Sequence, residues 1–378
     1  MKIIIDDAVS FAEEAFSQFG EVELKPGREI TNSRCKSADA LITRSITDVN
    51  ETLLAGTKVK FVGTATIGTD HIDLNYLKKK GISFASAAGC NADAVAEYFF
   101  VALFELLIKY GLQISDLTLG VVGCGNIGSR VVRFGEAAGF NVLVNDPPLK
   151  RKTGSSRFLK LDDVLQSDII TFHVPLNIGG ADNTYHLIEE SKLKLIKDGA
   201  IIINAARGPV IDNSDLMKYI QLRRFKTVLD VWESEPNINV GLLQLTEFGT
   251  PHIAGYSYEG KVNGTKMIYD AFCNYLDAPK TWTPVLTSVE KNLKVIEEDL
   301  PLENSLHTIF SSIYDIKNDD KDIRTIANIP NSKRSFHFDK LRKNYNLRRE
   351  FSNYNINLIK KNDELEKVLN AFRFNVMS

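Results

Sequence analysis

Three glycines that follow a short apolar run are the residues with the clearest chemical meaning. Gly123, Gly125 and Gly128 spell G-x-G-x-x-G. The first glycine permits a tight turn, the second lets the backbone approach a pyrophosphate, and the third allows a helix to pack closely on a strand. A helix predicted to begin near Asn126 would direct its N–H groups and positive dipole end at the phosphates. The motif predicts a dinucleotide site that includes Gly125, Asn126 and Ile127.

An acidic residue selects the form of the dinucleotide. Asp146 ends a strand predicted over residues 141–146, eighteen residues after the third glycine. A carboxylate at this place accepts hydrogen bonds from both ribose hydroxyls and repels a 2′-phosphate. The next residues, Pro147, Pro148 and Leu149, supply no arginine that would reverse this preference. We therefore expect NAD rather than NADP as the cofactor.

Three polar residues follow further predicted strands, at the sheet edge where open α/β folds bind ligands. Arg207, Glu235 and His252 accompany the strands predicted at 200–204, 227–231 and around 248–251. Oxidation of a 2-hydroxy acid needs a base for the hydroxyl proton, and imidazole suits this role because its ordinary pKa is near neutral. Guanidinium binds a carboxylate bidentately, and a glutamate favours the imidazolium that forms. Each residue alone is more often structural, but together they predict a hydroxy-acid dehydrogenase site.

Length and composition limit the classes of protein to which this chain can belong. A chain of 378 residues exceeds the ~250–300 at which one core usually stops growing, so we expect two or three domains. With 46 basic and 48 acidic residues and a pI near 6.3, we expect a small-molecule partner and no nucleic acid. The apolar stretch 94–108 contains Glu97 and Glu105, so it predicts a buried helix and no membrane partner. The four cysteines show no disulfide or metal-ligand spacing, which favours a cytoplasmic protein without a metal.

Short β-rich runs alternate with helical runs, and this pattern predicts parallel sheets. In the first part of the chain, strands are predicted at 2–6, 21–24, 38–43, 60–66 and 81–86, and another is predicted at 168–172. We expect an α/β fold with two Rossmann-like or flavodoxin-like parallel-sheet lobes. A discontinuous substrate-binding (lid) domain, at 1–93 and 256–283, would flank an NAD-binding Rossmann domain at 94–255. The sequence becomes more polar at 284–378, which predicts a small α+β domain. We assign this domain to homodimerisation, because the residues expected to carry the dehydrogenase chemistry all precede it.

A basic stretch lies within this last segment. Residues 333–349 contain seven Lys or Arg side chains and one acid, Asp339. Such a run is usually a solvated or subunit-facing surface, and it also suits contact with an anionic partner. The sequence leaves both interpretations open.

These motifs resemble those of the D-isomer-specific 2-hydroxyacid dehydrogenases. Besides the glycine motif with Asp146, the resemblance rests on Asn-Ala-Ala-Arg-Gly at 204–208, Asp-Val-Trp-Glu-Ser-Glu-Pro at 230–236 and Thr-Pro-His-Ile-Ala-Gly at 250–255. Segments 40–45, 60–71, 89–92 and 338–345 narrow the resemblance to one branch of this family. The resemblance covers nearly the whole chain. The resemblance implies oxidation of 4-phospho-D-erythronate to (R)-3-hydroxy-2-oxo-4-phosphooxybutanoate by NAD, in pyridoxal 5′-phosphate biosynthesis.

The resemblance also implies roles for individual residues. It makes Arg207, Glu235 and His252 catalytic, with His252 transferring the proton. The substrate-contacting positions are Ser45, Thr66 and Tyr256, and the NAD-contacting ones are Asp146, Ala205, Ala206, Arg207, Asp230 and Gly255. Val174 stands at a cofactor position where a hydroxyl-bearing residue is expected, so NAD would lose one hydrogen bond, worth ~1 kcal/mol.

Two other functions fit the same residues. Another D-2-hydroxyacid dehydrogenase, such as a phosphoglycerate dehydrogenase, would share the catalytic set, because sequence spacing does not register one carbon atom of a substrate. A non-catalytic NAD-sensing binding protein with this fold would also keep the three residues. Turnover of 4-phosphoerythronate and of 3-phosphoglycerate separates the two enzymes, and turnover of neither would favour the sensor.

Overall fold

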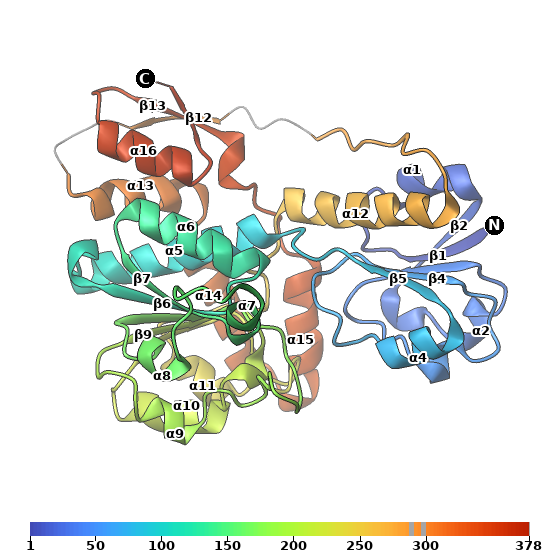
Figure 1. The fold of residues 1–378 in the computed structure, drawn as a ribbon, viewed down its shortest axis with the longest axis horizontal. Coiled ribbons are helices and arrows are strands. Elements are labelled where there is room, and N and C mark those ends of the chain that lie inside the picture. The colour runs from blue at the N-terminus through green and yellow to red at the C-terminus, as the bar shows by residue number, and fades with distance from the viewer. Residues whose placement is uncertain (287–290, 296–299, 378) are drawn as a thin grey trace. The chain divides into compact units, whose positions relative to one another are not determined.

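The computed structural model describes residues 1–286, 291–295 and 300–377 (Figure 1). By their contacts, the described residues form two compact units. Unit 1 contains residues 1–91 and 257–286, and unit 2 contains residues 92–256 together with the described residues from 291 onward. The chain therefore leaves unit 1 once, builds the central part of unit 2, and returns to unit 1 before its C-terminal segment.

Unit 1 is built on a five-stranded parallel sheet with the order β2-β1-β3-β4-β5. Its strands are β1 (Lys2–Asp6), β2 (Glu21–Lys25), β3 (Ala40–Thr43), β4 (Phe61–Thr64) and β5 (Ser83–Ser86). Its helices are α1 (Ala12–Phe16), α2 (Asn32–Cys35), α3 (Glu51–Leu54), α4 (Leu74–Lys80) and α12 (Tyr258–Leu276). Because successive side chains of a strand face opposite ways, Ile3 and Ile5 pack with α1 and α12 while Ile4 packs with α2, α3 and α4. Both faces of the sheet are thus covered, as parallel sheets require.

The central sheet of unit 2 has six parallel strands in the order β11-β10-β9-β8-β6-β7. They are β6 (Thr118–Val122), β7 (Asn141–Asn145), β8 (Ile169–Phe172), β9 (Ile201–Asn204), β10 (Lys226–Leu229) and β11 (Phe248–Gly249). Strand β7 lies on one side of β6 and β8 on the other, so the order of strand addition reverses at β6. Ligands of open α/β sheets bind at the carboxyl ends of the strands beside such a reversal.

Helices cover both faces of this sheet (Figure 1). One face packs against α5 (Ala92–Tyr110) and α6 (Asn126–Ala138). The other face packs against α8 (Leu161–Val164), α9 (Glu190–Leu193), α10 (Asn213–Gln221) and α11 (Val240–Leu245), and α7 (Pro147–Thr153) follows β7. Every residue of α5 from Ala94 to Leu107 is buried, including two glutamates. A helix that is apolar on all sides needs partners on all sides.

The C-terminal segment supplies the remaining partners of α5. It contains β12 (Lys291–Val295), α13 (Leu302–Ile313), α14 (Ile316–Arg324), α15 (Asn331–Lys343), β13 (Tyr354–Leu358), α16 (Asp363–Ala371) and β14 (Asn375–Met377), and its strands form a parallel sheet. Phe372 stacks on Phe134 at 4.7 Å and meets Phe100 edge-on at 4.8 Å, and Phe310 meets Phe104 at 5.3 Å. The segment therefore shares one apolar core with α5 and α6, and a separate domain at 284–378 stays a prediction.

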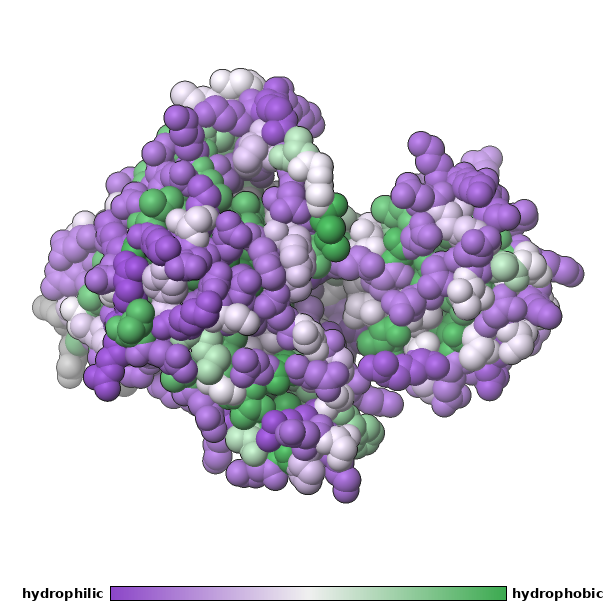
Figure 2. Space-filling model, turned by 90° about the horizontal axis from the view of Figure 1, so that it is seen from below, coloured by the Kyte–Doolittle hydropathy of each residue, from purple (hydrophilic) through white to green (hydrophobic). Residues whose placement is uncertain are grey.

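The surface reflects the balanced composition. The face drawn in Figure 2 is mostly hydrophilic, with smaller apolar areas between the polar ones. Large exposed apolar side chains include Ile178, Leu222 and Phe336, which lie far apart in the sequence. Scattered apolar side chains of this kind are normal on protein surfaces. Among the described residues, none of the helices is both long and apolar enough to cross a membrane.

Candidate active site

The turn between β6 and α6 has the backbone shape of a phosphate-binding loop. Gly123 has a φ of 90°, and a Cβ there would lie 2.8 Å from the backbone of His173. A Cβ on Gly128 would collide with the Gly123 carbonyl oxygen, so α6 packs directly on the turn. A Cβ on Gly125 would meet no described atom within 4 Å, which leaves open space at the N-terminal end of α6. The turn therefore fits the pyrophosphate of a dinucleotide.

Asp146 lies beside this turn, directly after β7. Its Oδ2 accepts a hydrogen bond from the Cys124 N–H at 2.8 Å, and its Oδ1 accepts the Leu149 N–H at 2.8 Å. The first bond ties the carboxylate to the glycine turn, and the second caps the N-terminus of α7. This position is the one that a ribose-binding acid needs, and the contact with ribose stays a prediction.

We expect Asp146→Ala to erode the preference for NAD over NADP by roughly tenfold, because the repulsion of the 2′-phosphate is removed. Any loosening of the glycine turn weakens both cofactors alike, so the ratio of the two kcat/KM values isolates the effect of charge. Asp146→Asn is the matched control that keeps a hydrogen-bond acceptor without the charge. An unaltered ratio in both variants would refute the ribose role.

His173 and Val174 follow β8 and border the same turn. His173 Nε2 lies 3.1 Å from Thr171 Oγ1, and burial lowers the pKa of His173 to about 3. The imidazole is therefore neutral and suits a wall or orienting role rather than proton transfer. Val174 Cγ1 occupies the space that a Cβ on Gly123 would need, and its side chain carries no hydroxyl.

The neutral His173 makes the stability of the protein depend on pH. An unfolded histidine titrates near 6.5 and the folded one near 3, so this stabilisation is complete above pH 6.5 and is lost as the pH falls toward 3. Between pH 7 and pH 5 we expect His173→Asn to lose roughly 2 kcal/mol less free energy of unfolding than the unaltered protein. Urea unfolding at both pH values measures this, with His337→Asn on α15 as the control. Equal pH dependence in the two would contradict the neutral state of His173.

The turn that presents Arg207 is fixed by the residue that ends β9. Asn204 Oδ1 accepts the Ala206 N–H at 3.0 Å, and Asn204 Nδ2 donates to the Arg207 carbonyl oxygen at 3.0 Å. Arg207 Nη1 donates to the Ala206 carbonyl oxygen at 2.7 Å. Ala205, Ala206 and Arg207 thus stand together at the carboxyl edge of the sheet, with the Arg207 side chain partly exposed.

His252 and Glu235 form a direct pair at the neighbouring strand ends. His252 Nδ1 lies 2.7 Å from Glu235 Oε2, and Glu235 Oε1 accepts the Trp232 N–H at 2.8 Å. Burial alone would raise the pKa of Glu235, but the charge and hydrogen bond of His252 outweigh it and hold that pKa below its usual value. The carboxylate is therefore ionised, and since it engages Nδ1, Nε2 is the nitrogen available for a substrate proton.

Glu235→Gln keeps the shape of this pair and removes its negative charge. Imidazolium at His252 then loses its partner, so we expect the limb of the pH–rate profile that reports His252 to move to lower pH. The profile of kcat/KM measures the shift. Glu189→Gln, the same change at an exposed glutamate of unit 2, is the control and should leave the limb in place. A limb that stays fixed in Glu235→Gln would mean that the two side chains do not interact in the working enzyme.

Asp230, Gly255 and Tyr256 belong to the same region of unit 2. The Asp230 side chain is 1% exposed and binds the backbone after His252, so its contact with NAD stays a prediction. Gly255 is partly exposed within that loop. The Tyr256 ring meets the Tyr345 ring at 6.0 Å, and the guanidinium of Arg342 lies 5.8 Å from its centroid.

Ser45 and Thr66 stand at one edge of the sheet in unit 1. Ser45 follows β3 and Thr66 follows β4, and these strands are neighbours in parallel register. Ser45 is exposed, whereas Thr66 Oγ1 lies 2.8 Å from Thr64 Oγ1 and donates to the Gly68 carbonyl oxygen. The two hydroxyl residues are thus presented on the same side of the unit.

Comparison with known proteins identifies the family. A family model described as "D-isomer specific 2-hydroxyacid dehydrogenase, NAD binding domain" matches residues 106–254. The erythronate-4-phosphate dehydrogenase of Proteus mirabilis (strain HI4320) is 42% identical over 379 residues, which cover 99% of each chain. This chain belongs to the erythronate-4-phosphate dehydrogenases. Residues 288–372 match a second model, for a domain of unknown function.

Solved structures of more distant relatives confirm the α/β fold and the NAD cofactor. The D-lactate dehydrogenase of Aquifex aeolicus, in complex with NAD and lactic acid, has a TM-score of 0.61 and 27% identity, over 73% of this chain and 96% of that one. The NAD⁺-bound 3-phosphoglycerate dehydrogenase of Entamoeba histolytica has a TM-score of 0.61 and 25% identity, over 73% and 95%. The chain is therefore an NAD-dependent enzyme that acts on a small hydroxy acid.

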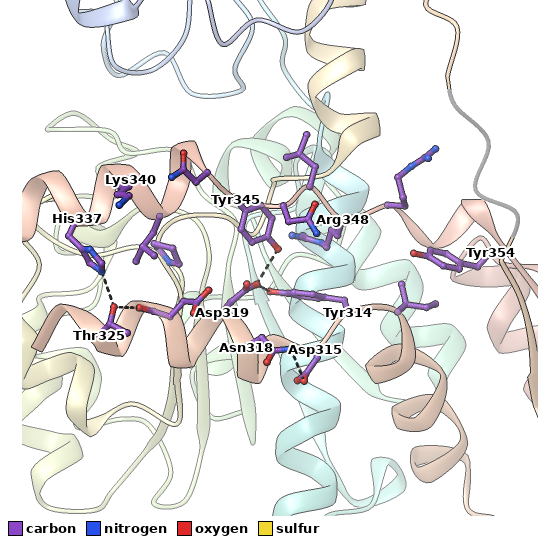
Figure 3. Close-up of a pocket in the computed structure, with 18 residues that line it drawn as sticks. Tyr314, Asp315, Asn318, Asp319, Thr325, His337, Lys340, Tyr345, Arg348 and Tyr354 are labelled. Carbon is purple, nitrogen blue, oxygen red and sulfur yellow. Dashed lines mark hydrogen bonds between the residues drawn. The ribbon is translucent and has the colours of Figure 1, made fainter. Parts of the chain in front are cut away.

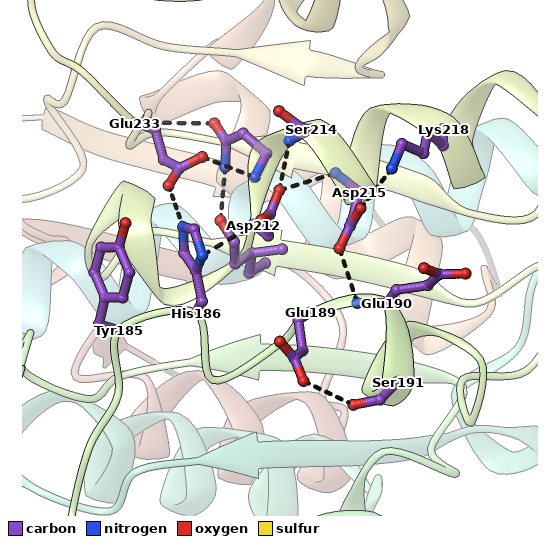
Figure 4. Close-up of polar contacts among 12 residues, drawn as sticks. Tyr185, His186, Glu189, Glu190, Ser191, Asp212, Ser214, Asp215, Lys218 and Glu233 are labelled. Atoms are coloured by element: carbon purple, nitrogen blue, oxygen red, sulfur yellow. Dashed lines mark hydrogen bonds and ion pairs between the residues drawn. The ribbon is translucent and has the colours of Figure 1, made fainter. Parts of the chain in front are cut away.

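The sequence did not indicate a polar cluster around His186 (Figure 4). His186 Nε2 lies 2.5 Å from Glu233 Oε1, and Nδ1 lies 3.3 Å from Asp212 Oδ2. Glu233 Oε2 accepts the Asn213 N–H at 2.9 Å, and the His186 N–H donates to the Pro209 carbonyl oxygen at 2.7 Å. The cluster joins the loop after Arg207 to the loop before Glu235. Its partners lie far apart in the sequence, so no local pattern indicated it.

Proposed function

We propose that this chain oxidises 4-phospho-D-erythronate at its 2-hydroxyl to (R)-3-hydroxy-2-oxo-4-phosphooxybutanoate, in pyridoxal 5′-phosphate biosynthesis. The observation that carries the proposal is the contact of His252 Nδ1 with Glu235 Oε2 at the carboxyl edge of an NAD-binding sheet. Family membership supports the choice of substrate, because the Proteus mirabilis relative is named for erythronate 4-phosphate.

Each polar group has a defined task in this reaction. The guanidinium of Arg207 binds the substrate carboxylate and orients the reacting carbon. Nε2 of His252 accepts the 2-hydroxyl proton, and Glu235 stabilises the resulting imidazolium. Bound NAD supplies a hydride acceptor. Gly125, with Asn126 and Ile127 at the start of α6, would hold its pyrophosphate, and Asp146 its ribose.

The hydroxyls of Ser45, Thr66 and Tyr256 are the proposed contacts for the remaining oxygens of the substrate. Hydroxyl groups bind phosphate and hydroxyl oxygens without burying an unpaired charge. Arg44 is a further candidate for the phosphate, but its charge acts on the carboxylate of Asp6, whose pKa burial raises. The charge of Arg44 thus already acts on a carboxylate of unit 1.

Steady-state oxidation of 4-phosphoerythronate and of 3-phosphoglycerate tests the proposal. We expect kcat/KM to favour the four-carbon substrate by roughly 10–200-fold, the range set by one additional small group in a binding pocket. A preference for 3-phosphoglycerate would assign the chain to phosphoglycerate oxidation instead. Binding of NAD without turnover of either compound would favour an NAD-sensing protein.

We also propose that the protein is a cytoplasmic homodimer that associates through residues 284–378. A symmetric pair is the commonest closed assembly, and Phe336 of α15 is 74% exposed. All four cysteines are free thiols, which supports a reducing compartment. Light scattering on the full chain tests the assembly. We expect Phe336→Asp to weaken association. Leu222→Asp, at the C-terminal end of α10, is the control. A monomeric full chain would contradict the dimer.

A further inference from the structure

The loop that carries His252 is held on its N–H side by one carboxylate. Asp230 Oδ1 accepts hydrogen bonds from Thr250 Oγ1 at 2.6 Å and from the Ile253 N–H at 2.7 Å. Its Oδ2 accepts the Ala254 N–H at 3.0 Å, and its carbonyl oxygen accepts the His252 N–H at 2.8 Å. His252 itself has a φ of 57°, in the left-handed region. A non-glycine residue keeps such a conformation only where its surroundings enforce it.

The carbonyl side of the same loop is held by one guanidinium from the C-terminal segment. Arg348 Nη1 donates to the carbonyl oxygens of Ile253 at 3.1 Å and Tyr256 at 3.4 Å. Its Nη2 donates to the carbonyl oxygen of Ala254, and also to that of Ala94 in α5 at 2.9 Å. Buried carbonyl groups need a donor, because an unsatisfied one is destabilising. A single side chain, about 95 residues further along the chain, supplies three carbonyls of this loop.

Arg348 is itself fixed in place. It is buried, and its guanidinium lies 4.6 Å from the centroid of the Tyr314 ring, an arrangement that favours a cation. The hydroxyls of Tyr314 and Tyr345 both donate to Asp319 Oδ2, at 2.7 and 3.1 Å (Figure 3). These groups surround the guanidinium with an aromatic face and a nearby carboxylate. The loop after His252 therefore lies between a fixed anion, Asp230, and a fixed cation.

We propose that Arg348 is a positioning residue of the dehydrogenase, which fixes the loop after His252 so that the imidazole stays against Glu235. The inference rests on the proposed function, since it assumes that His252 moves the substrate proton. It gives the C-terminal segment, whose residues 288–372 match a domain of unknown function, a part in the reaction itself. This part is independent of any role of the segment in association.

Loss of Arg348 would release one side of the loop after His252. Three carbonyls lose their donor directly after the residue that carries the imidazole. The loop then relaxes on one side only, because Asp230 still holds its N–H groups. A displacement of a reacting group by about 1 Å costs on the order of 10²-fold in rate. The glycine turn and Asp146, which are proposed to hold NAD, do not contact Arg348 in the part of the chain that the structure describes, whereas Gly255, another proposed NAD contact, lies within the loop. We therefore expect kcat to fall by a larger factor than NAD affinity.

Arg348→Ala tests the proposal, with Arg373→Ala as the matched control. Arg373 is another arginine of the C-terminal segment and pairs with Asp93 at 2.8 Å and Glu350 at 3.3 Å, with no described contact to the loop. For Arg348→Ala we expect kcat on 4-phosphoerythronate to fall by at least roughly tenfold and the dissociation constant of NAD to change by less than about threefold. The limb of the pH–rate profile that reports His252 should shift in Arg348→Ala and stay fixed in Arg373→Ala.

Chemical rescue separates positioning from general destabilisation. Arg348 lines a cavity of about 900 Å³, so a small cation can reach the place that its side chain vacates. Millimolar guanidinium should restore part of the lost kcat of Arg348→Ala, whereas the same concentration of sodium should not. The proposal is overturned by a kcat within about threefold of the unaltered enzyme and an unshifted pH limb. It is also overturned by an equal loss in Arg373→Ala without rescue of Arg348→Ala.

Two further outcomes have a defined meaning. If Arg348→Ala fails to fold, Arg348→Lys tests the proposal instead. An ammonium keeps the charge but cannot donate to three carbonyls in one plane. A loss of roughly fivefold or more in its kcat supports the proposal, and a loss below about twofold overturns it. If the unaltered protein does not oxidise 4-phosphoerythronate, the proposed function fails and the inference with it. If the unaltered protein oxidises 4-phosphoerythronate and Arg348→Ala does so equally well, the inference about Arg348 fails and the proposed function stands.

Discussion

Replacing His252 with alanine is expected to lower kcat by roughly 10²–10⁴, the usual contribution of a positioned acid–base group. The reason is geometric, because Glu235 engages Nδ1 at 2.7 Å and leaves Nε2 for the substrate proton. NAD binding should stay close to that of the unaltered protein, since the glycine turn is separate from this pair. Single-turnover kinetics and an NAD titration on the same preparation measure both quantities.

The control for this experiment is His337→Ala on α15, which should leave kcat unchanged. The double variant His252→Ala with Glu235→Gln adds a stricter test. If the two side chains act as one unit, the double variant should be little worse than His252→Ala alone, because groups that act together are not additive. Turnover of His252→Ala within about threefold of the unaltered enzyme would remove His252 from proton transfer.

Arg207→Lys is expected to lower kcat/KM strongly, although the positive charge is kept. Lysine cannot reproduce the planar fork that binds both oxygens of a carboxylate, so the substrate loses one hydrogen bond and its fixed orientation. We expect kcat/KM on 4-phosphoerythronate to fall by roughly 10–10²-fold. Asn204 holds the backbone of this turn through Ala206 and through the Arg207 carbonyl, so the presentation of the residue is unchanged by the substitution.

Arg224→Lys is the control for a lost guanidinium elsewhere in unit 2, where Arg224 pairs with Asp198. Its kcat/KM should stay at the unaltered value. A loss in Arg207→Lys below about fivefold, less than ~1 kcal/mol, would exclude Arg207 from the carboxylate site. An equal loss in both variants would point to stability rather than to substrate binding.

The sequence predicted the strands of the two larger sheets well, because many of them are short apolar runs bounded by turn residues, whereas it predicted none of β12, β13 and β14. The strand predicted at 2–6 is β1, and the strand predicted at 141–146 is β7, which ends one residue earlier. The helix predicted at 94–108 is α5, extended by two residues at each end. Near the site the boundaries were less accurate. The strand expected around 248–251 ends at Gly249, shortly before Pro251, which has no backbone N–H to continue the pairing.

The packing of the C-terminal segment was not predictable in the same way. Phe310, Phe351, Phe372 and Phe374 are scattered through a polar sequence, and no local period shows that they belong to one core. The role of Arg348 was not predictable for the same reason, because the loop carbonyls that it contacts are more than ninety residues away in the sequence. Sequence patterns report faces of single elements, whereas a contact of this kind exists only once distant elements meet.

The burial of α5 on all sides has a consequence for how the protein is made. Its residues Phe100 and Phe104 are covered by Phe372 and Phe310, which leave the ribosome long after α5 itself. At about 5–20 residues per second, the stretch after residue 284 takes roughly 5–20 s to synthesise. Throughout that interval the outer side of α5 faces water or a chaperone. Emergence of Phe310 and Phe372, rather than emergence of the dinucleotide sheet, therefore sets the earliest moment at which α5 can be fully packed.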